Sequence, residues 1–412
     1  MLRRSPLQRV YRVAVLVTVA LFVPRVVASS RGVRGGEFAA YWTAARLVSE
    51  GAPVDRFYED AEFRAHLRAN GIAQNDIWYP NPPTTALVFL PLSGRRYEAA
   101  RAAWVGLSGL LLVGMVALLA RAAALEGGLL AAFVLFGLHG QPSLADLGHG
   151  QAYAFVTALL AVAARAFVLG RPRAFGSLLG VLAPVKLAGG HLWLLAIPRR
   201  LRTGLLWGVG SAAILVLLSV PFVGLAGWRA FLTVPGRIAS DPTFSVTAFQ
   251  SLGGLVRRLF VPDPTWNPRP LLDAPFVADA LVVAAQLALA GIVLALGGRD
   301  REPGLALSAA VLAGLLASPF SQDYTYVQAV VPAAFVLSAL QGGRVPGRTL
   351  AAFAGLLLIG ASGWHKSAAF QDGAAALLAY PKVYGALILL VLTVQLSTEP
   401  QRDRSEPRPL AS

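Results

Sequence analysis

The sequence has no cysteine, and this absence excludes disulfide frameworks, thiolate nucleophiles and cysteine-ligated metal sites. Charged residues are scarce, because they make up 14% of the 412 residues, where soluble domains carry about 25%. The chain also lacks the P-loop, HExxH and GxSxG signatures of phosphate-binding loops, zinc proteases and serine hydrolases. Together these absences exclude a soluble nucleotide-dependent enzyme.

Apolar residues are abundant instead, at 56% of the chain, and the mean hydropathy is +0.61. This composition predicts one integral membrane domain over residues 1–398 and excludes a disordered or fibrous chain. The net charge is +15, and only three of the 36 basic residues are lysines. Many arginines lie in short loops between apolar runs, as the positive-inside rule predicts. No basic stretch is interleaved with stacking aromatic residues, so nucleic acid is not an expected partner.

The apolar runs predict an all-α polytopic membrane protein with about twelve transmembrane helices, in a range of about ten to thirteen. The runs cover residues 11–29, 99–120, 127–140, 151–169, 174–185, 189–198, 204–223, 277–297, 303–319, 325–341, 348–363 and 375–396. The runs 127–140, 174–185 and 189–198 fall short of the roughly 20 residues that a span usually needs.

Short basic loops set the expected orientation. Arginines at the N-terminus and in alternate connections all fall on one side if the spans alternate, which places both termini in the cytoplasm. These residues are Arg3, Arg4, Arg9, Arg12, Arg171, Arg173, Arg199, Arg200, Arg202, Arg299, Arg301, Arg344 and Arg348. Residues 399–412 are rich in proline and charge, and we expect a disordered cytoplasmic tail. The first run is either a signal anchor or a signal peptide cleaved near Val27-Ala28-Ser29.

Two long connections, at about 30–98 and 224–276, are then external. The first has helical periodicity at 38–50 and 59–70, which predicts interfacial helices, and a proline-rich turn follows them. Its apolar stretch 84–92 is too short to span, so we expect it to dip into the membrane or pack on the bundle. Long connections that stay apolar and aromatic are typical of ordered functional loops.

Ionisable side chains collect at the outer ends of the predicted spans, which indicates a site at the outer membrane boundary. Glu37 follows Gly35-Gly36 after the first span, and it is either a general base or a plain acid at a helix start. Asp323, in the turn 318–324, is either a second carboxylate of the site or a helix cap.

Three further residues suit a phosphate or sugar ligand. Lys186 lies between two short apolar runs, and it is either a cation for a lipid-linked phosphate or a lysine that snorkels to the interface. His149 and Gln151 belong to the stretch 139–151, whose two histidines are ten residues apart, wider than metal ligands usually are. We therefore expect no metal there and favour polar contacts to a sugar or phosphate. The alternative is that these side chains only cap the end of a membrane-spanning helix.

Several motifs follow one another in a set order. They are Glu37-Phe38, Tyr41, Ala44-Ala45, Gly51, Phe57-Tyr58, Tyr79-Pro80-Asn81-Pro82-Pro83, Trp104, Gly150-Gln151, Lys186, Ser318-Pro319 and Tyr324. In this order and spacing, over roughly residues 30–345, the chain resembles glycosyltransferase family 87, which is related to polyprenol-phosphate-mannose-dependent mannosyltransferases. The chain departs from the family in three places. Glu37 occupies a position where the family usually has an aspartate, and Gln322-Asp323 occupies the position of a histidine-containing pattern. Ala188-Gly189 replaces a proline of the family.

The resemblance implies a bundle of the GT-C type, with the first outer loop over the active site. It implies that a hexose, mannose in the first instance, moves from polyprenyl phosphate to a lipid or glycan acceptor with inversion and without an organic cofactor. Glu37 and Asp323 are then the expected catalytic residues. Lys186, His149, Gln151, Tyr324 and Tyr79 are the expected donor-binding residues. The expected location is the outer face of a bacterial plasma membrane, with membrane lipids as further partners.

Two other functions stay open at this point. A multi-span transporter or flippase is supported by the short runs around Lys186, which suit a discontinuous helix. A non-catalytic assembly subunit would tolerate the loss of Glu37. A transporter needs a polar path through the membrane, whereas a lipid-dependent transferase needs only an outer cavity that opens to the lipid. The one-sided gathering of polar residues favours the transferase.

Overall fold

The computed structural model describes residues 6–32, 35–74, 77–199, 201–298, 303–341, 345–361 and 363–399. Within these ranges every regular element is a helix, and an isolated β-bridge joins Asp263 and Asn267. The predicted all-α class is therefore confirmed. Several arginines used for the orientation and the predicted tail beyond Glu399 lie outside the described residues, namely Arg3, Arg4, Arg200, Arg299, Arg301, Arg344 and residues 400–412.

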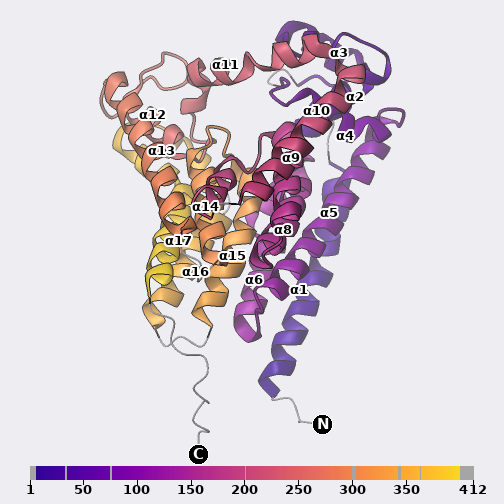
Figure 1. Ribbon diagram of the computed structural model, residues 1–412. Coiled ribbons are helices and arrows are strands. Elements are labelled where there is room, and N and C mark those ends of the chain that lie inside the picture. Colours follow the sequence, from indigo (N-terminus) through magenta and orange to yellow (C-terminus); the bar gives the residue numbers. More distant parts are fainter. Residues whose placement is uncertain are drawn as a thin grey trace, which may run out of the picture.

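Two groups of long helices form the body of the molecule (Figure 1). The first group comprises α1 (Pro6–Ser30), α5 (Tyr97–Ala122), α6 (Gly127–His139), α7 (Gln141–His149), α8 (Tyr153–Val168), α9 (Pro172–Lys186) and α10 (Arg202–Phe231). The second comprises α13 (Pro275–Gly297), α14 (Pro303–Ala317), the 3-10 helix η5 (Asp323–Ala329), α15 (Val330–Leu340), α16 (Pro346–Gly360) and α17 (Pro381–Thr398). Helix α1 begins and α17 ends at the same end of the bundle, in agreement with the prediction that both termini share one side.

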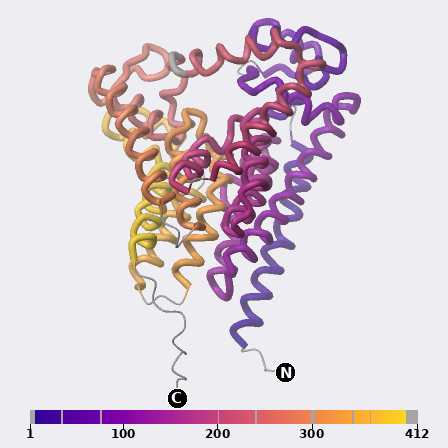
Figure 2. Tube along the Cα trace, in the orientation of Figure 1, coloured from indigo at the N-terminus to yellow at the C-terminus, as the bar shows by residue number. Residues whose placement is uncertain are grey.

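Shorter helices crowd the opposite end, where the two groups lean apart (Figure 2). The first long connection supplies α2 (Glu37–Ser49), η1 (Val54–Tyr58), α3 (Asp60–Ala69), α4 (Pro83–Phe89) and η2 (Leu90–Leu92). The second supplies α11 (Val234–Ser240), η4 (Pro242–Ser245) and α12 (Leu252–Phe260). The segment before α17 adds η6 (Gly363–Lys366), η7 (Ala368–Phe370) and η8 (Gly373–Ala379). Helix α11 runs across the space between the two groups (Figure 1).

Among the described residues, seven helices are long and apolar enough to cross a membrane: Pro6–Ser30, Tyr97–Ala122, Gly127–His149, Arg202–Ile238, Pro275–Gly297, Asp323–Leu340 and Pro381–Thr398. The predicted span 189–198 contains only the seven-residue 3-10 helix η3 (Gly190–Ala196). At the rise of a 3-10 helix this segment is about 14 Å long, well below the ~30 Å of a bilayer core. The chain is a polytopic membrane protein, while the count of about twelve spans stays a prediction.

Both helices predicted in the first outer connection are present. Helix α2 covers Glu37–Ser49 against the predicted 38–50, and α3 covers Asp60–Ala69 against 59–70. The stretch 84–92 folds as α4 and η2 and packs against α2, so it does not span. Helix α2 is buried on nearly every side, because the chain around Gly150 closes over it in addition to α4 and α5.

Close packing in the first group depends on glycine. Gly176 and Gly180 of α9 face Gly204 and Gly208 of α10, so the two helices run parallel where they touch. A Cβ atom added to Gly176 would lie 1.9 Å from the carbonyl oxygen of Gly204, and one added to Gly180 would lie 2.1 Å from that of Gly208. Small residues spaced in this way let membrane helices approach backbone to backbone.

Replacing Gly176 by alanine should destabilise the protein, because the new methyl group overlaps a backbone carbonyl of α10. Overpacking of this kind costs about 1–3 kcal/mol. Gly210 of the same α10 has open space at its Cβ position, so Gly210→Ala is the matched control and should not lower stability. The melting temperatures of the purified variants in detergent measure the difference, and equal values would contradict the prediction.

Candidate functional site

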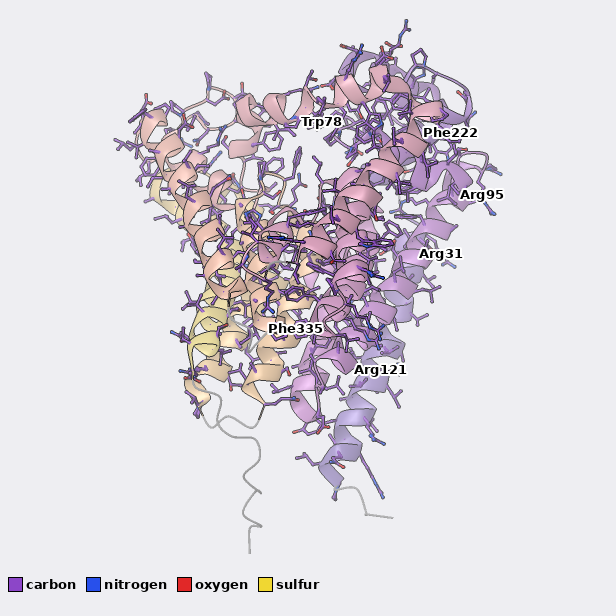
Figure 3. The ribbon with its side chains drawn as sticks, in the orientation of Figure 1. Arg31, Trp78, Arg95, Arg121, Phe222 and Phe335 are labelled. Carbon is purple, nitrogen blue, oxygen red and sulfur yellow. The ribbon has the colours of Figure 1, made fainter. Side chains whose placement is uncertain are left out.

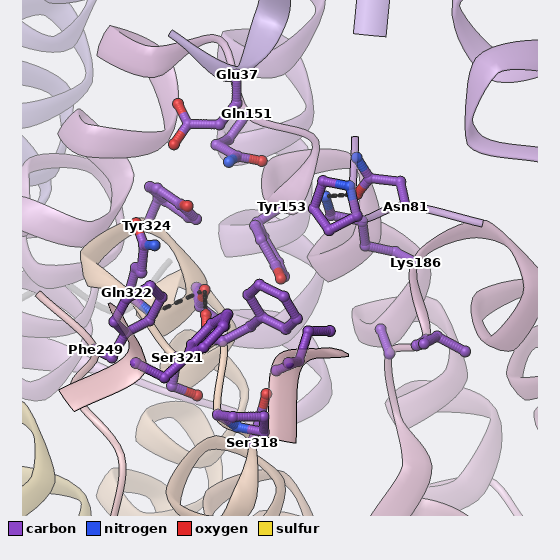
Figure 4. A pocket seen from close by; sticks show the side chains of 18 of the residues that line it. Glu37, Asn81, Gln151, Tyr153, Lys186, Phe249, Ser318, Ser321, Gln322 and Tyr324 are labelled. Carbon is purple, nitrogen blue, oxygen red and sulfur yellow. Dashed lines mark hydrogen bonds between the residues drawn. The ribbon is translucent and has the colours of Figure 1, made fainter. Parts of the chain in front are cut away.

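A cavity of about 1010 Å³ lies between the two helix groups, at the end that carries α2, α3 and α11. It is lined by the start of α2, the proline-rich turn before α4, the segments after α7 and α9, helix α11 and the start of η5. Figure 4 shows the polar side chains that point into it from both groups. Of the seven predicted site residues, five line this cavity: Glu37, His149, Gln151, Lys186 and Tyr324.

The turn before α2 places Glu37 on the cavity. Gly36 has φ of 68°, a left-handed value that favours glycine, and a Cβ atom there would lie 3.1 Å from the carbonyl oxygen of His149. The Gly36 N–H donates to Oε1 of Gln74 at 2.7 Å, and the Gly35 N–H donates to the Tyr97 hydroxyl at 3.2 Å. The Gly-Gly sequence therefore lets the first residue of α2 stand directly against the end of α7.

His149 contacts the Glu37 carboxylate. Its Nδ1 lies 3.0 Å from Oε2 of Glu37, and the ring of Tyr324 lies beside the His149 ring, with 5.7 Å between the ring centres. Burial raises the pKa of Glu37, but the hydrogen bond and the charge of His149 outweigh this effect and leave the pKa below its ordinary value. The carboxylate is therefore ionised near neutral pH, which is the form that accepts a proton.

Lys186 brings a cation to the same cavity. Its Nζ donates to the Tyr41 hydroxyl at 2.6 Å and to Oδ1 of Asn81 (Figure 4), and it lies 4.8 Å above the ring of Tyr41 and 5.3 Å above that of Tyr153. In the part of the chain that the structure describes, no carboxylate lies within ion-pair distance of this ammonium. Burial lowers the pKa of Lys186 to about 7, so an anion bound in the cavity would favour its charged form.

The position of Lys186 depends on contacts from outside its helix. Helix α9 ends there because Leu187 takes the left-handed φ of 50°. The carbonyl groups of Pro184 and Val185 accept hydrogen bonds from the hydroxyls of Thr84 and Thr85 in α4. These two threonines satisfy carbonyls that the end of a helix leaves without partners.

Gln151 supports Lys186 from a third segment. The Tyr41 hydroxyl that accepts from Lys186 donates to Oε1 of Gln151 at 2.5 Å. The carbonyl oxygen of Gln151 in turn accepts from Nε1 of Trp104 at 3.1 Å. Gln151 therefore orients Tyr41, although it was predicted to bind the donor directly, a role that remains open because it also lines the cavity.

The structure places Asp323 away from Glu37, in a buried charged cluster behind the cavity. Its Oδ2 lies 2.8 Å from Nζ of Lys366, and its Oδ1 lies 3.4 Å from both Nζ of Lys382 and Nε2 of His365. Asp323 and Lys382 are 3% and 0% exposed. Asp323 is absent from the cavity wall, and its ion pairs indicate a role in the fold, while its role as a second carboxylate of the site stays a prediction.

Tyr79 is also outside the cavity wall. Its ring is 1% exposed and packs against Phe57 and Phe63, and its hydroxyl donates to the carbonyl oxygen of Pro82 at 3.4 Å. Tyr79 therefore shapes the turn that carries Asn81 into the site. It acts on the site through the backbone and does not contact a ligand in the cavity.

Sequence reasoning missed an ion pair that joins the two outer connections over the cavity. Nη1 of Arg237 in α11 donates to Oδ1 of Asp60 in α3 at 3.0 Å, and a second nitrogen reaches Oδ2 at 2.5 Å. Arg64 also contacts Asp60 at 2.9 Å, and the Arg237 guanidinium stacks 4.6 Å above Trp78. The partners are 177 residues apart, and no local pattern marks such a pair. Within the described residues, no group of three or more acidic or histidine side chains is arranged to hold a metal ion.

Replacing Asp323 by asparagine should lower the free energy of unfolding by about 3–5 kcal/mol, because Lys382 then keeps a buried charge without a counterion. Asp273→Asn, at an exposed position before α13, is the control and should change stability little. Denaturant titration in detergent provides the measurement. Equal stability of the two variants would mean that the cluster is not structural.

Comparison with known proteins identifies the family. The profile of glycosyltransferase family 87 matches residues 79–319, which is more than half of the chain. A search of curated proteins returned no match. Among solved structures, the crystal structure of ArnT from Cupriavidus metallidurans bound to undecaprenyl phosphate matches with a TM-score of 0.38 and 17% identity, over 93% of this chain and 76% of that chain. A likeness this distant carries no argument about the site. On the strength of the family profile and its apolar helices, this protein belongs to glycosyltransferase family 87 and is a membrane glycosyltransferase.

Proposed function

We propose that the protein moves a hexose, with mannose as the first sugar to test, from a polyprenyl-phosphate donor to a hydroxyl group of a lipid or glycan acceptor. The reaction takes place at the outer face of a bacterial plasma membrane. The observation that carries the proposal is the presence of one ionised carboxylate, Glu37, and one lysine without a carboxylate partner in the described residues, Lys186, on the same cavity. Transfer from a lipid phosphate needs both, because a base must activate the acceptor and a positive charge must stabilise the leaving phosphate.

Glu37 is the base in this mechanism. The acceptor oxygen attacks the anomeric carbon, its proton passes to the Glu37 carboxylate, and the bond between the anomeric carbon and the phosphate oxygen breaks. A single displacement of this kind inverts the anomeric centre and forms no covalent enzyme intermediate. His149, whose side chain is 49% exposed and 3.0 Å from the carboxylate, offers the proton a route to water. Tyr324 lines the cavity beside this pair and comes from the second helix group.

Lys186 is the phosphate ligand in the same mechanism. Its ammonium is held by Tyr41 and Asn81, so it needs little reorganisation when charge develops on the leaving group. The cavity also has apolar walls from the bundle, including Leu160, Leu192 and Val311. A polar end beside apolar walls suits a donor that combines a sugar phosphate with a hydrocarbon chain.

Replacing Glu37 by glutamine should lower the rate of transfer at least about a hundredfold, the scale of general-base catalysis, because the amide cannot accept the proton. Glu50→Gln, at the exposed far end of the same α2, is the control and should keep wild-type transfer. Membranes that contain each variant would receive radiolabelled polyprenyl-phosphate mannose, and label in lipid and glycan fractions would be counted. Equal transfer by both variants would remove Glu37 as the base. Labelled donor that crosses sealed vesicles without any transfer would favour the flippase alternative.

Replacing Lys186 by glutamine should raise the KM for the donor about tenfold or more, because a charge-assisted hydrogen bond to phosphate is lost. Lys366→Gln removes the same charge from a half-exposed lysine that pairs with Asp323 outside the cavity, and it should leave the KM unchanged. Initial rates at varied donor concentration separate KM from kcat. A similar change of KM in both variants would show that Lys186 acts through the overall charge and not as a ligand.

A further inference from the structure

A second cavity lies near the opposite end of the first helix group, and the proposed reaction does not use it. It measures about 480 Å³ and is lined by Leu118, Arg121 and Ala122 near the end of α5 and by Arg165, Val168 and Leu169 near the end of α8. In Figure 3, Arg121 lies in the lower half of the bundle, whereas Arg95, which precedes α5, lies toward the upper end. Two arginines and several apolar residues therefore line one small cavity toward the end where α1 begins.

The helix ends themselves do not need these two arginines. After α5, the carbonyl of Ala123 accepts from the Ser338 hydroxyl at 2.6 Å, and that of Ala124 accepts from Nε2 of Gln341 at 2.9 Å. At the end of α8, the carbonyl of Arg165 accepts from the N–H of Leu169 at 3.0 Å. The carbonyl groups that a terminal arginine often caps are thus already occupied.

Neither guanidinium has a counterion in the part of the chain that the structure describes. The ion pairs found there involve other arginines, and both Arg121 and Arg165 are exposed side chains. Two like charges that face one cavity repel each other, and an anion between them would turn this repulsion into attraction. Phosphate is the anion that suits two guanidinium groups, because two of its oxygens can accept parallel N–H hydrogen bonds from each group.

The apolar part of the wall decides between a free phosphate and a lipid. Leu169 is 50% exposed, and Leu118 and Val168 are partly exposed on the same cavity, near the ends of the apolar helices α5 and α8. A hydrated phosphate ion gains nothing from such a surface, whereas an acyl chain buries it. Basic pockets between transmembrane helices are known to bind anionic head groups.

We propose that the cavity between the ends of α5 and α8 binds an anionic diacyl phospholipid. Its phosphate lies between Arg121 and Arg165, and an acyl chain lies along Leu118, Val168 and Leu169. The site is independent of the proposed sugar transfer, so its test requires no substrate and stands if the transfer assay fails.

Native mass spectrometry of the delipidated protein in detergent tests the site. Dioleoyl phosphatidylglycerol and dioleoyl phosphatidylcholine, which share their acyl chains, would be titrated separately. We expect the wild type to bind the first phosphatidylglycerol about tenfold to thirtyfold more tightly than phosphatidylcholine, the scale expected of two cations beside an anionic head group. The double variant Arg121→Gln/Arg165→Gln should lose this preference. The double variant Arg121→Lys/Arg165→Lys should keep part of it, because lysine keeps the positive charge but cannot form the paired hydrogen bonds of a guanidinium group.

The control removes the same charge elsewhere. Arg95→Gln/Arg96→Gln changes two exposed arginines before α5, at the other end of the bundle, and it should keep the full preference. An equal loss in this control would overturn the proposal, because the preference would then follow the net charge. No preference in the wild type would also overturn it. Displacement of the lipid by millimolar inorganic phosphate alone would show a phosphate site without a lipid requirement, and would likewise refute the lipid assignment. Size-exclusion profiles confirm that each variant is folded.

Discussion

The partly buried ammonium group of Lys186 joins the first long connection of this protein to its helix bundle. A lysine at the end of a helix inside a bundle loses its water, so the protein must solvate it. Here Tyr41 comes from α2, Asn81 from the turn before α4, and Tyr153 from α8. Gln151 then orients Tyr41. The contacts that solvate Lys186 are therefore also the contacts that seat the first outer connection on the helices below it.

The charged side chains of Asp323 and Lys186 differ in the partners that surround them. In the second helix group Asp323 is surrounded by Lys366, Lys382 and His365, so its charge is neutralised within the protein. In the first group Lys186 donates hydrogen bonds to Tyr41 and Asn81 and contacts aromatic rings, but it has no carboxylate partner in the described residues. A carboxylate paired in this way contributes to the stability of the fold, whereas a lysine without a counterion can attract an anionic ligand. This difference separates the Asp323 cluster from the lysine that we propose binds the donor phosphate.

Local patterns predicted the all-α class, and together with the family resemblance they named Glu37, His149, Gln151, Lys186 and Tyr324, which line one cavity. Helical periodicity and the alternation of spans determine at which end of the bundle a residue lies, and the resemblance selected among the residues at that end. The direction of a side chain within that end depends on tertiary packing instead. Asp323 and Tyr324 are neighbours in η5, yet one points into a buried cluster and the other into the cavity. The pairing of Asp60 with Arg237 is equally invisible in a single sequence, because it joins two distant connections.

The threonine contacts at the end of α9 have a consequence for how the chain assembles. During synthesis α4 leaves the ribosome long before α9, because residues 83–89 precede residues 172–186. Until Thr84 and Thr85 dock, the last carbonyls of α9 have no partner and cannot be left in hydrocarbon. The end of α9 is therefore held by a segment that was made earlier. We expect the first long connection to be in place before the Lys186 end of α9 becomes ordered.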